Sequence, residues 1–267
     1  MNREIAIRLI FFFGLFVLFA VWERYNPRRQ QWIPKKQRWF NNLSIASLDA
    51  LIVRLLLPLV PVSVALLAKE RGWGLFSLFD MPYLLEASLA VIALDFVIYI
   101  QHVLFHAIPL LWRFHIVHHA DLDLDVTSGL RFHPIEIILS MAIKLTAIAL
   151  LGAPPGAVLL FEMLLNGTSM FNHSNLFIPL NLDRILRLFV VTPDMHRVHH
   201  SVILKETDSN YGFSLPWWDR LLGTYRSQPT QGHQTMRIGL SRFLNDKRQT
   251  LRWLLVLPFL KQANKYS

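Results

Sequence analysis

Long apolar runs separated by shorter polar connections set the pattern of this chain. About 20 apolar residues are needed to cross a bilayer as a helix. Five runs approach or exceed that length, and they cover Ile5–Trp22, Leu43–Ala68, Pro82–Phe105, Pro134–Leu151 and Ala157–Phe171. The pattern predicts an all-α fold, a polytopic bundle of membrane helices.

The first run is expected to stay in the protein as a membrane anchor. A secretory signal peptide is the alternative, but it requires small residues at a cleavage site. Trp22, Glu23 and Arg24 follow the run instead. We therefore expect Ile5–Trp22 to be a retained transmembrane helix.

The fourth and fifth runs are expected to form a helical hairpin. The sequence Gly-Ala-Pro-Pro-Gly at 152–156 lies between them, and it is typical of a turn. The hairpin would return the chain to the side of the membrane from which it came.

The positions of the basic residues predict which side of the membrane faces the cytoplasm. The segment Glu23–Asn42 carries six Lys and Arg residues against a single Glu. Connections of this kind face the cytoplasm. If the helices alternate, the third run and the hairpin both end on the cytoplasmic side. Residues near 102–119 and 173–200 should then lie together on that face.

Composition supports a membrane protein and removes several kinds of chemistry. Hydrophobic residues make up 53% of the 267 residues and charged residues 17%, whereas soluble domains carry about 25% charged residues. The absence of cysteine excludes disulfides, iron–sulfur clusters and thiolate zinc sites. The net charge of +9 would fit a nucleic-acid partner, but the basic residues lie beside apolar runs, as in membrane proteins. We expect a membrane and no nucleic acid.

Histidines are concentrated in three short segments. Eight of the eleven lie in one H-x-x-x-H pair and two H-x-x-H-H boxes, namely His102 and His106, then His115, His118 and His119, then His196, His199 and His200. On a helix, positions i, i+3 and i+4 share one face, so each box is expected to direct its imidazoles the same way. Imidazole binds iron, zinc, copper and nickel, and such faces predict a multi-histidine metal site.

The number of imidazoles indicates two metals in one pocket. A zinc site needs only three or four protein ligands. Iron held by nitrogen ligands with open positions can activate dioxygen. At a membrane face, such a pocket predicts hydroxylation or desaturation of a lipid.

Other functions stay open at this point. A zinc-dependent membrane hydrolase, the main alternative, would activate water, although no H-E-x-x-H motif is present. A bis-histidine haem carrier would need facing histidines near mid-membrane. A metal transporter would distribute its ligands along a pore.

The histidine boxes and their flanks resemble the fatty acid hydroxylase/sterol desaturase superfamily, over about residues 85–226. The flanking residues are Asp95, Arg131–Pro134, Asn172–Asn175, Pro193–Ser201, Asn210–Gly212, Trp218–Asp219 and Gly223–Tyr225. The resemblance implies a membrane di-iron oxidoreductase that acts on a fatty acyl chain, a sterol or a related lipid. It also implies dioxygen as co-substrate, and electrons from a separate ferredoxin- or cytochrome-type protein with its reductase.

Nine histidines are expected to be ligands: His102, His106, His115, His118, His119, His173, His196, His199 and His200. His173 is included because it ends the predicted hairpin in a family-like context. His133 is either a further ligand, a residue that supports one, or the start of a helix before Pro134. His233 is expected at the surface.

Three further groups of side chains are given roles. Asp95 lies two turns before His102, and we expect it to orient a ligand imidazole, the alternative being a hydrogen bond between helices. Arg131 and Arg197 could pair with Asp194, Asp123 or lipid phosphate. Trp217, Trp218 and Tyr225 are expected to be anchors at the membrane interface.

The chain is expected to have three parts. Residues 1–80 hold the first membrane helices and the basic loop, 81–230 form a catalytic domain like that of the fatty acid hydroxylases, and 231–267 form a tail. The apolar run Leu251–Leu260 is too short to span and predicts an interfacial helix. The expected location is an integral, multi-pass protein of a bacterial inner membrane, with a cytoplasmic active site.

Overall fold

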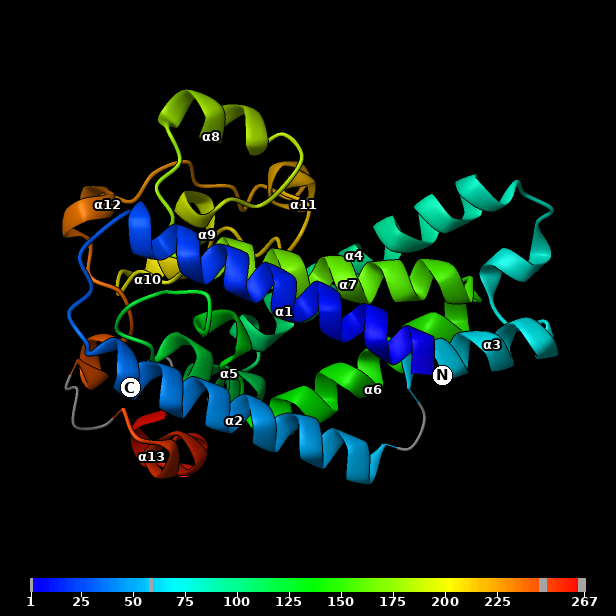
Figure 1. Ribbon diagram of the computed structural model, residues 1–267, viewed down its shortest axis with the longest axis horizontal. Coiled ribbons are helices and arrows are strands. Elements are labelled where there is room, and N and C mark those ends of the chain that lie inside the picture. The colour runs from blue at the N-terminus through cyan, green and yellow to red at the C-terminus, as the bar shows by residue number, and fades with distance from the viewer. Residues whose placement is uncertain (1, 58–59, 245–248, 264–267) are drawn as a thin grey trace.

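The structure is a computed structural model that describes residues 2–57, 60–244 and 249–263 (Figure 1). Within these ranges the chain is helical and contains no β-strand, and only isolated bridges join Pro27 to Leu176 and Ser201 to Ile238. The predicted all-α class is confirmed.

Long helices make up one half of the molecule. They are α1 (Asn2–Tyr25), α2 (Lys35–Leu56), α3 (Pro61–Arg71), α4 (Tyr83–Ala107), α6 (Pro134–Leu151) and α7 (Pro155–His173). Four stretches are long and apolar enough to cross a membrane: Glu4–Tyr25, Lys35–Leu78, Tyr83–Ala107 and Pro134–Leu151. The predicted polytopic membrane bundle is thereby confirmed.

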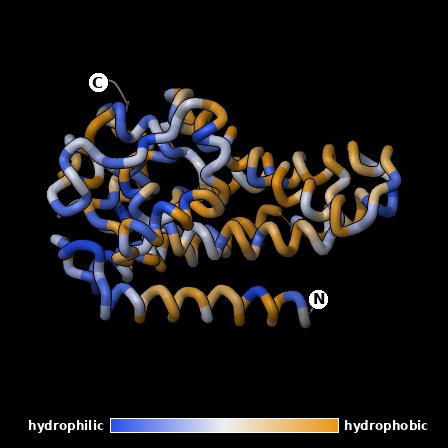
Figure 2. The backbone as a smooth tube through the Cα atoms, turned by 90° about the horizontal axis from the view of Figure 1, so that it is seen from above, coloured by the Kyte–Doolittle hydropathy of each residue, from blue (hydrophilic) through white to orange (hydrophobic). Residues whose placement is uncertain are grey.

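Short helices gather at the other end of the bundle (Figure 1). They are η1 (Leu75–Leu78), α5 (Pro109–His119), η2 (Ser128–Leu130), α8 (Leu180–Leu186), α9 (Pro193–His199), α10 (Leu204–Thr207), α11 (Trp217–Leu221), α12 (Gly232–Thr235), η3 (Ser241–Phe243), α13 (Leu251–Val256), η5 (Leu257–Phe259) and η6 (Lys261–Ala263). Only η1 lies with the long helices. We call the remaining short helices, from α5 to η6, the cap. Figure 2 shows the contrast in hydropathy, with mostly hydrophobic long helices and a cap of mixed hydropathy.

Helix α7 lies inside the bundle. It packs against α1, α3 and α4, and it buries polar side chains such as Glu162 and Asn172. It is absent from the four candidate spans. Helix α7 can carry these polar side chains because the surrounding helices cover them.

The predicted run Leu43–Ala68 is two helices rather than one. Helix α2 ends at Leu56, and α3 begins at Pro61 after the extended residue Val60. Proline lacks the N–H that a helix interior requires, but it suits a first turn. The break therefore follows from Pro61.

A glycine contact closes the end of the bundle away from the cap. Gly74 and Gly152 both adopt positive φ, at 89° and 66°. A Cβ atom on Gly74 would lie 2.0 Å from the backbone nitrogen of Gly152. Only glycine allows the loop before η1 to touch the α6–α7 turn so closely.

The tail folds back over α2 and α5. Leu254 and Leu257 are buried with Ile45, Trp112 and Ile116 in one apolar cluster. The predicted run Leu251–Leu260 is helical only to Val256, with a 3₁₀ turn after it. Its position at a membrane interface, like the division of the chain into three parts, stays a prediction.

Candidate metal centre

Helices α4, α5, α7 and α9 bring the predicted histidines together. His102 and His106 lie in the last turns of α4, and His173 ends α7. One H-x-x-H-H box ends α5, and the other ends α9 with His200 as the residue directly after the helix. Proline at the first turn starts α5, α7 and α9, so each helix begins at a defined residue.

All nine predicted ligands fall into two groups. The five-histidine group consists of His102, His106, His115, His119 and His199, and the four-histidine group consists of His118, His173, His196 and His200. Within each group, one ring nitrogen per residue lies within 4.8 Å of the others. Each of these residues is at most 4% exposed. The structure thus contains two compact imidazole clusters, and their role as ligands stays a prediction.

Each H-x-x-H-H box is divided between the two groups. In α5, His115 and His119 belong to the five-histidine group and His118 to the four-histidine group. In α9 the division is reversed, with His199 in the first group and His196 and His200 in the second. The expectation that a whole box points one way is therefore corrected. The i, i+4 pair shares a direction, whereas the i+3 ring serves the neighbouring cluster.

Backbone and side-chain acceptors fix the orientation of most rings. The Nδ1 atoms of His102, His118, His173 and His199 lie 2.7, 3.2, 2.8 and 2.8 Å from the carbonyl oxygens of Tyr211, Arg131, Ser169 and Ser209. An acceptor at Nδ1 holds the proton there and leaves the Nε2 lone pair for a metal.

Two carboxylates take the same part in the five-histidine group. Glu136 Oε1 lies 2.6 Å from His115 Nδ1, and Asp208 Oδ1 lies 3.3 Å from His106 Nδ1. A carboxylate partner raises the basicity of a ligand imidazole and fixes its ring. Sequence reasoning missed Glu136, which follows His115 by 21 positions. Asp208 was interpreted as a support for the last histidine box or as part of a turn, and it lies instead beside His106, 102 positions earlier.

The donor atoms fit metal ions. In the four-histidine group, Nε2 of His173 lies 3.0 Å from Nε2 of His118 and 3.1 Å from Nε2 of His196. Two nitrogens bonded at about 2.1 Å to one ion lie roughly 3.0–3.4 Å apart. In the five-histidine group, the buried Nε2 atoms of His102 and His119 have no hydrogen-bond partner in the described chain. A bound cation would satisfy these atoms.

Burial keeps the imidazoles in the form that binds metal. It lowers the pKa of His118, His119, His196 and His200 well below the usual value, and the neighbouring imidazoles lower it further. These rings are therefore neutral at pH 7, and a metal ligand must be neutral imidazole.

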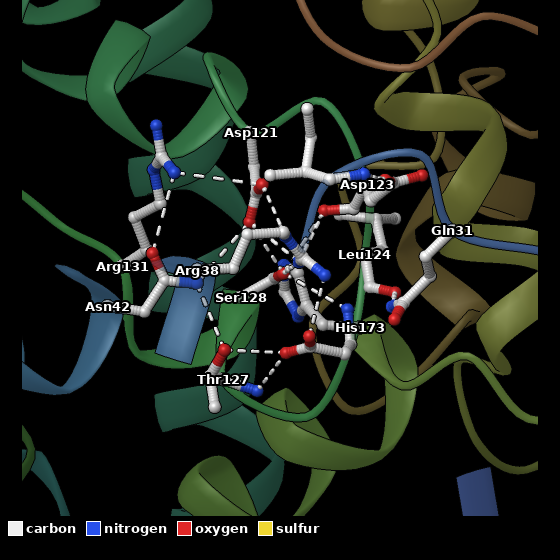
Figure 3. Close-up of polar contacts among 12 residues, drawn as sticks. Gln31, Arg38, Asn42, Asp121, Asp123, Leu124, Thr127, Ser128, Arg131 and His173 are labelled. Carbon is white, nitrogen blue, oxygen red and sulfur yellow. Dashed lines mark hydrogen bonds and ion pairs between the residues drawn. The ribbon is translucent and has the colours of Figure 1, made fainter. Parts of the chain in front are cut away.

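A buried network of ion pairs supports the second box (Figure 3). Arg38 reaches Asp121 at 3.1 Å and Asp125 at 2.6 Å. Arg131 donates to the carbonyl of Val117 at 2.9 Å and lies 3.6 Å from Asp121. Burial favours a raised pKa for Asp121, but the two arginines outweigh it and hold the pKa well below its usual range. The loop after the box is thus tied to α2 by permanent charges.

This network was not predicted from the sequence. Arg38 was interpreted only as a topological charge in the basic loop. The available signal was the alternation of Asp121, Asp123 and Asp125 directly after the second box. Asp123 accepts from the backbone nitrogens of Trp32 and Ile33, which anchors the basic loop to the same place.

The predicted arginine pairs are found in part. Arg197 pairs with Asp194, and Arg28 reaches the same carboxylate at 2.9 Å. Arg131 approaches Asp121, which was not among the partners considered for it. Asp194 thereby holds the start of α9 against the basic loop.

The predicted role of Asp95 is wrong in its contact. Asp95 Oδ2 accepts from Nε1 of Trp218 at 2.8 Å and from the nitrogen of Leu215 at 3.3 Å. Asp95 precedes His102 on α4. The Nδ1 atom of His102 faces the carbonyl oxygen of Tyr211 and not Asp95. Asp95 therefore ties α11 and the residue Leu215 before it to α4, and the position of Trp218 at a membrane interface stays a prediction.

Two other histidines lie apart from the clusters. The side chain of His133 accepts from Ile135 at the start of α6, so it caps a helix and belongs to neither group. His233 is 5% exposed and lies 3.6 Å from Asp194, so the expected surface position is wrong. Burial outweighs the nearby carboxylate and lowers the pKa of His233 to about 3.

A cavity of about 330 Å³ adjoins the five-histidine group. Its lining includes His102, His115, Asp49, Glu136, Phe132 and Lys144, from α2, α4, α5, α6 and the loop before α6. Ligand cavities of this size are lined mostly by apolar groups with a few polar ones. The cavity gives a ligand access to one cluster from within the helical bundle.

Two named proteins are similar in sequence to most of this chain. Ornithine lipid hydroxylase OlsE of Rhizobium tropici is 30% identical over 218 residues, which are 79% of this chain and 65% of that protein. Alkylglycerol monooxygenase of Homo sapiens is 27% identical over 190 residues, 69% of this chain and 41% of that protein. The chain spans less than two thirds of the length of these relatives. No solved structure matches it.

A protein-family profile matches the part of the chain that contains the histidine groups. The fatty acid hydroxylase profile matches residues 87–224, just over half of the chain. That range contains all nine clustered histidines, as the sequence resemblance implied. The chain belongs to the fatty acid hydroxylase family.

Proposed function

We propose that this protein is a membrane monooxygenase that uses dioxygen to hydroxylate a lipid at the two histidine groups. The observation that carries the proposal is the pair of buried, all-imidazole clusters beside a cavity within the bundle. Family membership and relatives named as a hydroxylase and a monooxygenase support it.

Each histidine group would hold one iron ion. Bound iron would supply the reduction of dioxygen that oxidation of an unactivated C–H bond requires. The chain itself fixes the ring tautomers through Tyr211, Ser209, Ser169 and Arg131, and burial of the nine rings excludes bulk water from them.

The electrons would come from a separate protein, of ferredoxin or cytochrome type with its reductase. In the overall reaction, one oxygen atom enters the C–H bond as hydroxyl and the other leaves as water. Two electrons and two protons are consumed. The proposal therefore needs a reductant of this class at the cap.

The site would face the cytoplasm of a bacterial cell from the inner membrane. The basic α1–α2 connection supports this orientation, because it contacts the loop after the second histidine box through Asp123 and basic connections face the cytoplasm. A bacterial relative of similar sequence supports the location.

Hydroxylation is favoured over desaturation, since both kinds of named relative insert oxygen. A zinc hydrolase gains no support from the comparisons. The candidate substrates are amphiphilic lipids such as ornithine lipids or alkylglycerols, after which these relatives are named.

Metal analysis with a turnover assay tests the proposal. Protein produced with iron and purified in detergent should contain about two irons per chain. With a ferredoxin, its reductase and dioxygen, it should convert an added ornithine lipid or alkylglycerol to a product heavier by one oxygen atom. Labelled dioxygen should supply that atom. Zinc alone, with no oxygen-dependent product after iron loading, would contradict the proposal.

A further inference from the structure

The cavity beside the five-histidine group contains acceptor atoms that lack a hydrogen-bond partner. They are Oδ1 of Asp49, Oε2 of Glu136 and Oε1 of Gln101, which all lie in its lining. Asp49 is 6% exposed and Glu136 is 4% exposed. A buried acceptor without a partner is costly, so this set is a feature that a ligand can satisfy.

Asp49 differs from the other charged residues of the lining. Its Oδ1 atom is buried and has no hydrogen-bond partner in the described ranges. Lys144, the cation of the same lining, is paired with Glu162 at 2.8 Å, and Glu162 also meets Arg8 at 2.7 Å. The charge of Lys144 is thus already balanced by Glu162, whereas Oδ1 of Asp49 and Oε2 of Glu136 meet no donor among the described residues.

Glu136 supplies a second acceptor oxygen to the cavity. Its Oε1 is engaged by His115, while Oε2 has no partner in the described chain. Gln101 donates to Ser140 at 3.0 Å and presents its carbonyl oxygen. A ligand that fits therefore donates hydrogen bonds, and a cationic donor suits two carboxyl groups best.

We infer that this cavity binds the ammonium group of a cationic lipid substrate, and that Asp49 is the residue that selects it. An ammonium group offers three donors and no acceptor, which matches the three unpartnered oxygens. An ionisable side chain buried within a membrane bundle is expected to meet a partner of opposite charge. The inference rests on the proposed function, because it treats the cavity as the substrate site.

The inference also specifies where the substrate is oxidised. His102 and His115 line the same cavity as Asp49 and Glu136. A nitrogen held between the two carboxyl groups would place carbons a few bonds away beside the five-histidine group. The hydroxyl group should therefore enter near the amine, not deep in an acyl chain.

Matched probes test the charge selection directly. Binding of dodecylamine and of dodecan-1-ol to the iron-loaded protein would be measured by native mass spectrometry, for the wild type, Asp49→Asn and Asp49→Glu. The exposed residue Asp80 supplies a control, Asp80→Asn. Iron content and thermal stability would show that each variant is folded.

The wild type should bind the amine at least about tenfold more tightly than the alcohol, because a buried charge pair is strongly weakened when one partner is removed. Asp49→Asn should abolish this preference and leave alcohol binding unchanged, while Asp49→Glu and Asp80→Asn keep the preference. Equal binding of both probes by the wild type, or an unchanged preference in Asp49→Asn, would overturn the inference.

Turnover separates this inference from the proposed function. If the wild type selects the amine through Asp49 but no lipid is hydroxylated, the cavity inference stands and the proposed function fails. If lipids are hydroxylated but Asp49→Asn weakens amine and alcohol equally, the function stands and the inference fails.

Discussion

The two histidine groups are built from overlapping helices but are supported differently. The five-histidine group receives carboxylates, Glu136 on His115 and Asp208 on His106, and it adjoins the cavity. Among the described contacts of the four-histidine group, the Nδ1 acceptors are the backbone carbonyls of Ser169 and Arg131.

This difference indicates a division of labour. Carboxylate partners raise the basicity of ligand imidazoles. Glu136 and Asp208 would therefore adjust the rings of the five-histidine group, which lies beside the cavity. The four-histidine group is instead held in place by rigid backbone, with Arg38 and Asp121 behind it. We therefore expect Glu136 and Asp208 to adjust the five-histidine group, and the backbone to position the four-histidine group.

The largest effect is expected from removing one ring of each group. His118→Ala and His199→Ala each delete the i+3 position of a box, in the four- and five-histidine groups respectively. Each should lower activity by more than the roughly 100-fold loss that supporting residues cause. Iron content and oxygen-dependent product would be measured in both. Full activity in either variant would remove its group from the mechanism.

The ion network behind the four-histidine group should be the next most sensitive feature. Arg38→Ala leaves Asp121 and Asp125 buried without their main partner, which costs about 3–5 kcal/mol. Thermal unfolding and iron content would be compared with Arg24→Ala, which removes an exposed arginine from the last turn of α1. If both variants unfold at the wild-type temperature, the network does not hold the second box.

Glu136→Gln tests the tuning of the five-histidine group. Loss of the carboxylate on His115 should lower metal affinity or activity about 10- to 100-fold, with the fold retained. Asp95→Asn is the matched comparison, because Asp95 is equally buried but contacts Trp218 instead of a ring. It should leave iron content unchanged and cost about 1 kcal/mol of stability. Equal iron loss in both variants would contradict this assignment.

The smallest effect is expected from lowering the pH, which acts on His233 of α12 beside Asp194 of α9. His233 beside Asp194 has its pKa lowered to about 3 by burial, against about 6.5 when unfolded. The unfolded chain therefore binds the proton first, and stability present above pH 6.5 is lost as the pH falls toward 3. At pH 5.5 the loss is about 1.4 kcal/mol. Unfolding temperatures at pH 7.5 and 5.5 should differ less in His233→Gln, and an unchanged difference would refute this contribution.

Local signals predicted the helices and the histidines well. The run Pro134–Leu151 has the same bounds as α6, because Pro134 and Gly152 mark its ends. The nine histidines were found because helical spacing and helix ends are local properties of the sequence. The break before Pro61 was missed because the apolar run continues through it.

The contacts between distant segments could not be predicted in this way. Asp95 was assigned to a histidine by its spacing along α4, but its partner Trp218 lies 123 residues away. Arg38 and Asp121 are 83 residues apart. Packing between distant elements decides whether a carboxylate contacts an imidazole, an indole or a guanidinium. The spacing of residues along a single sequence does not reveal this packing.

The reversed division of the last box has a consequence for synthesis of the protein. His196, His199 and His200 supply members of both clusters, so neither set is complete until α9 has left the ribosome. By then the four candidate spans have all been made. A nascent or truncated chain that ends before residue 196 would lack part of each cluster. If the two groups bind iron as proposed, full coordination of the ions would have to wait until the membrane-spanning helices have been synthesised.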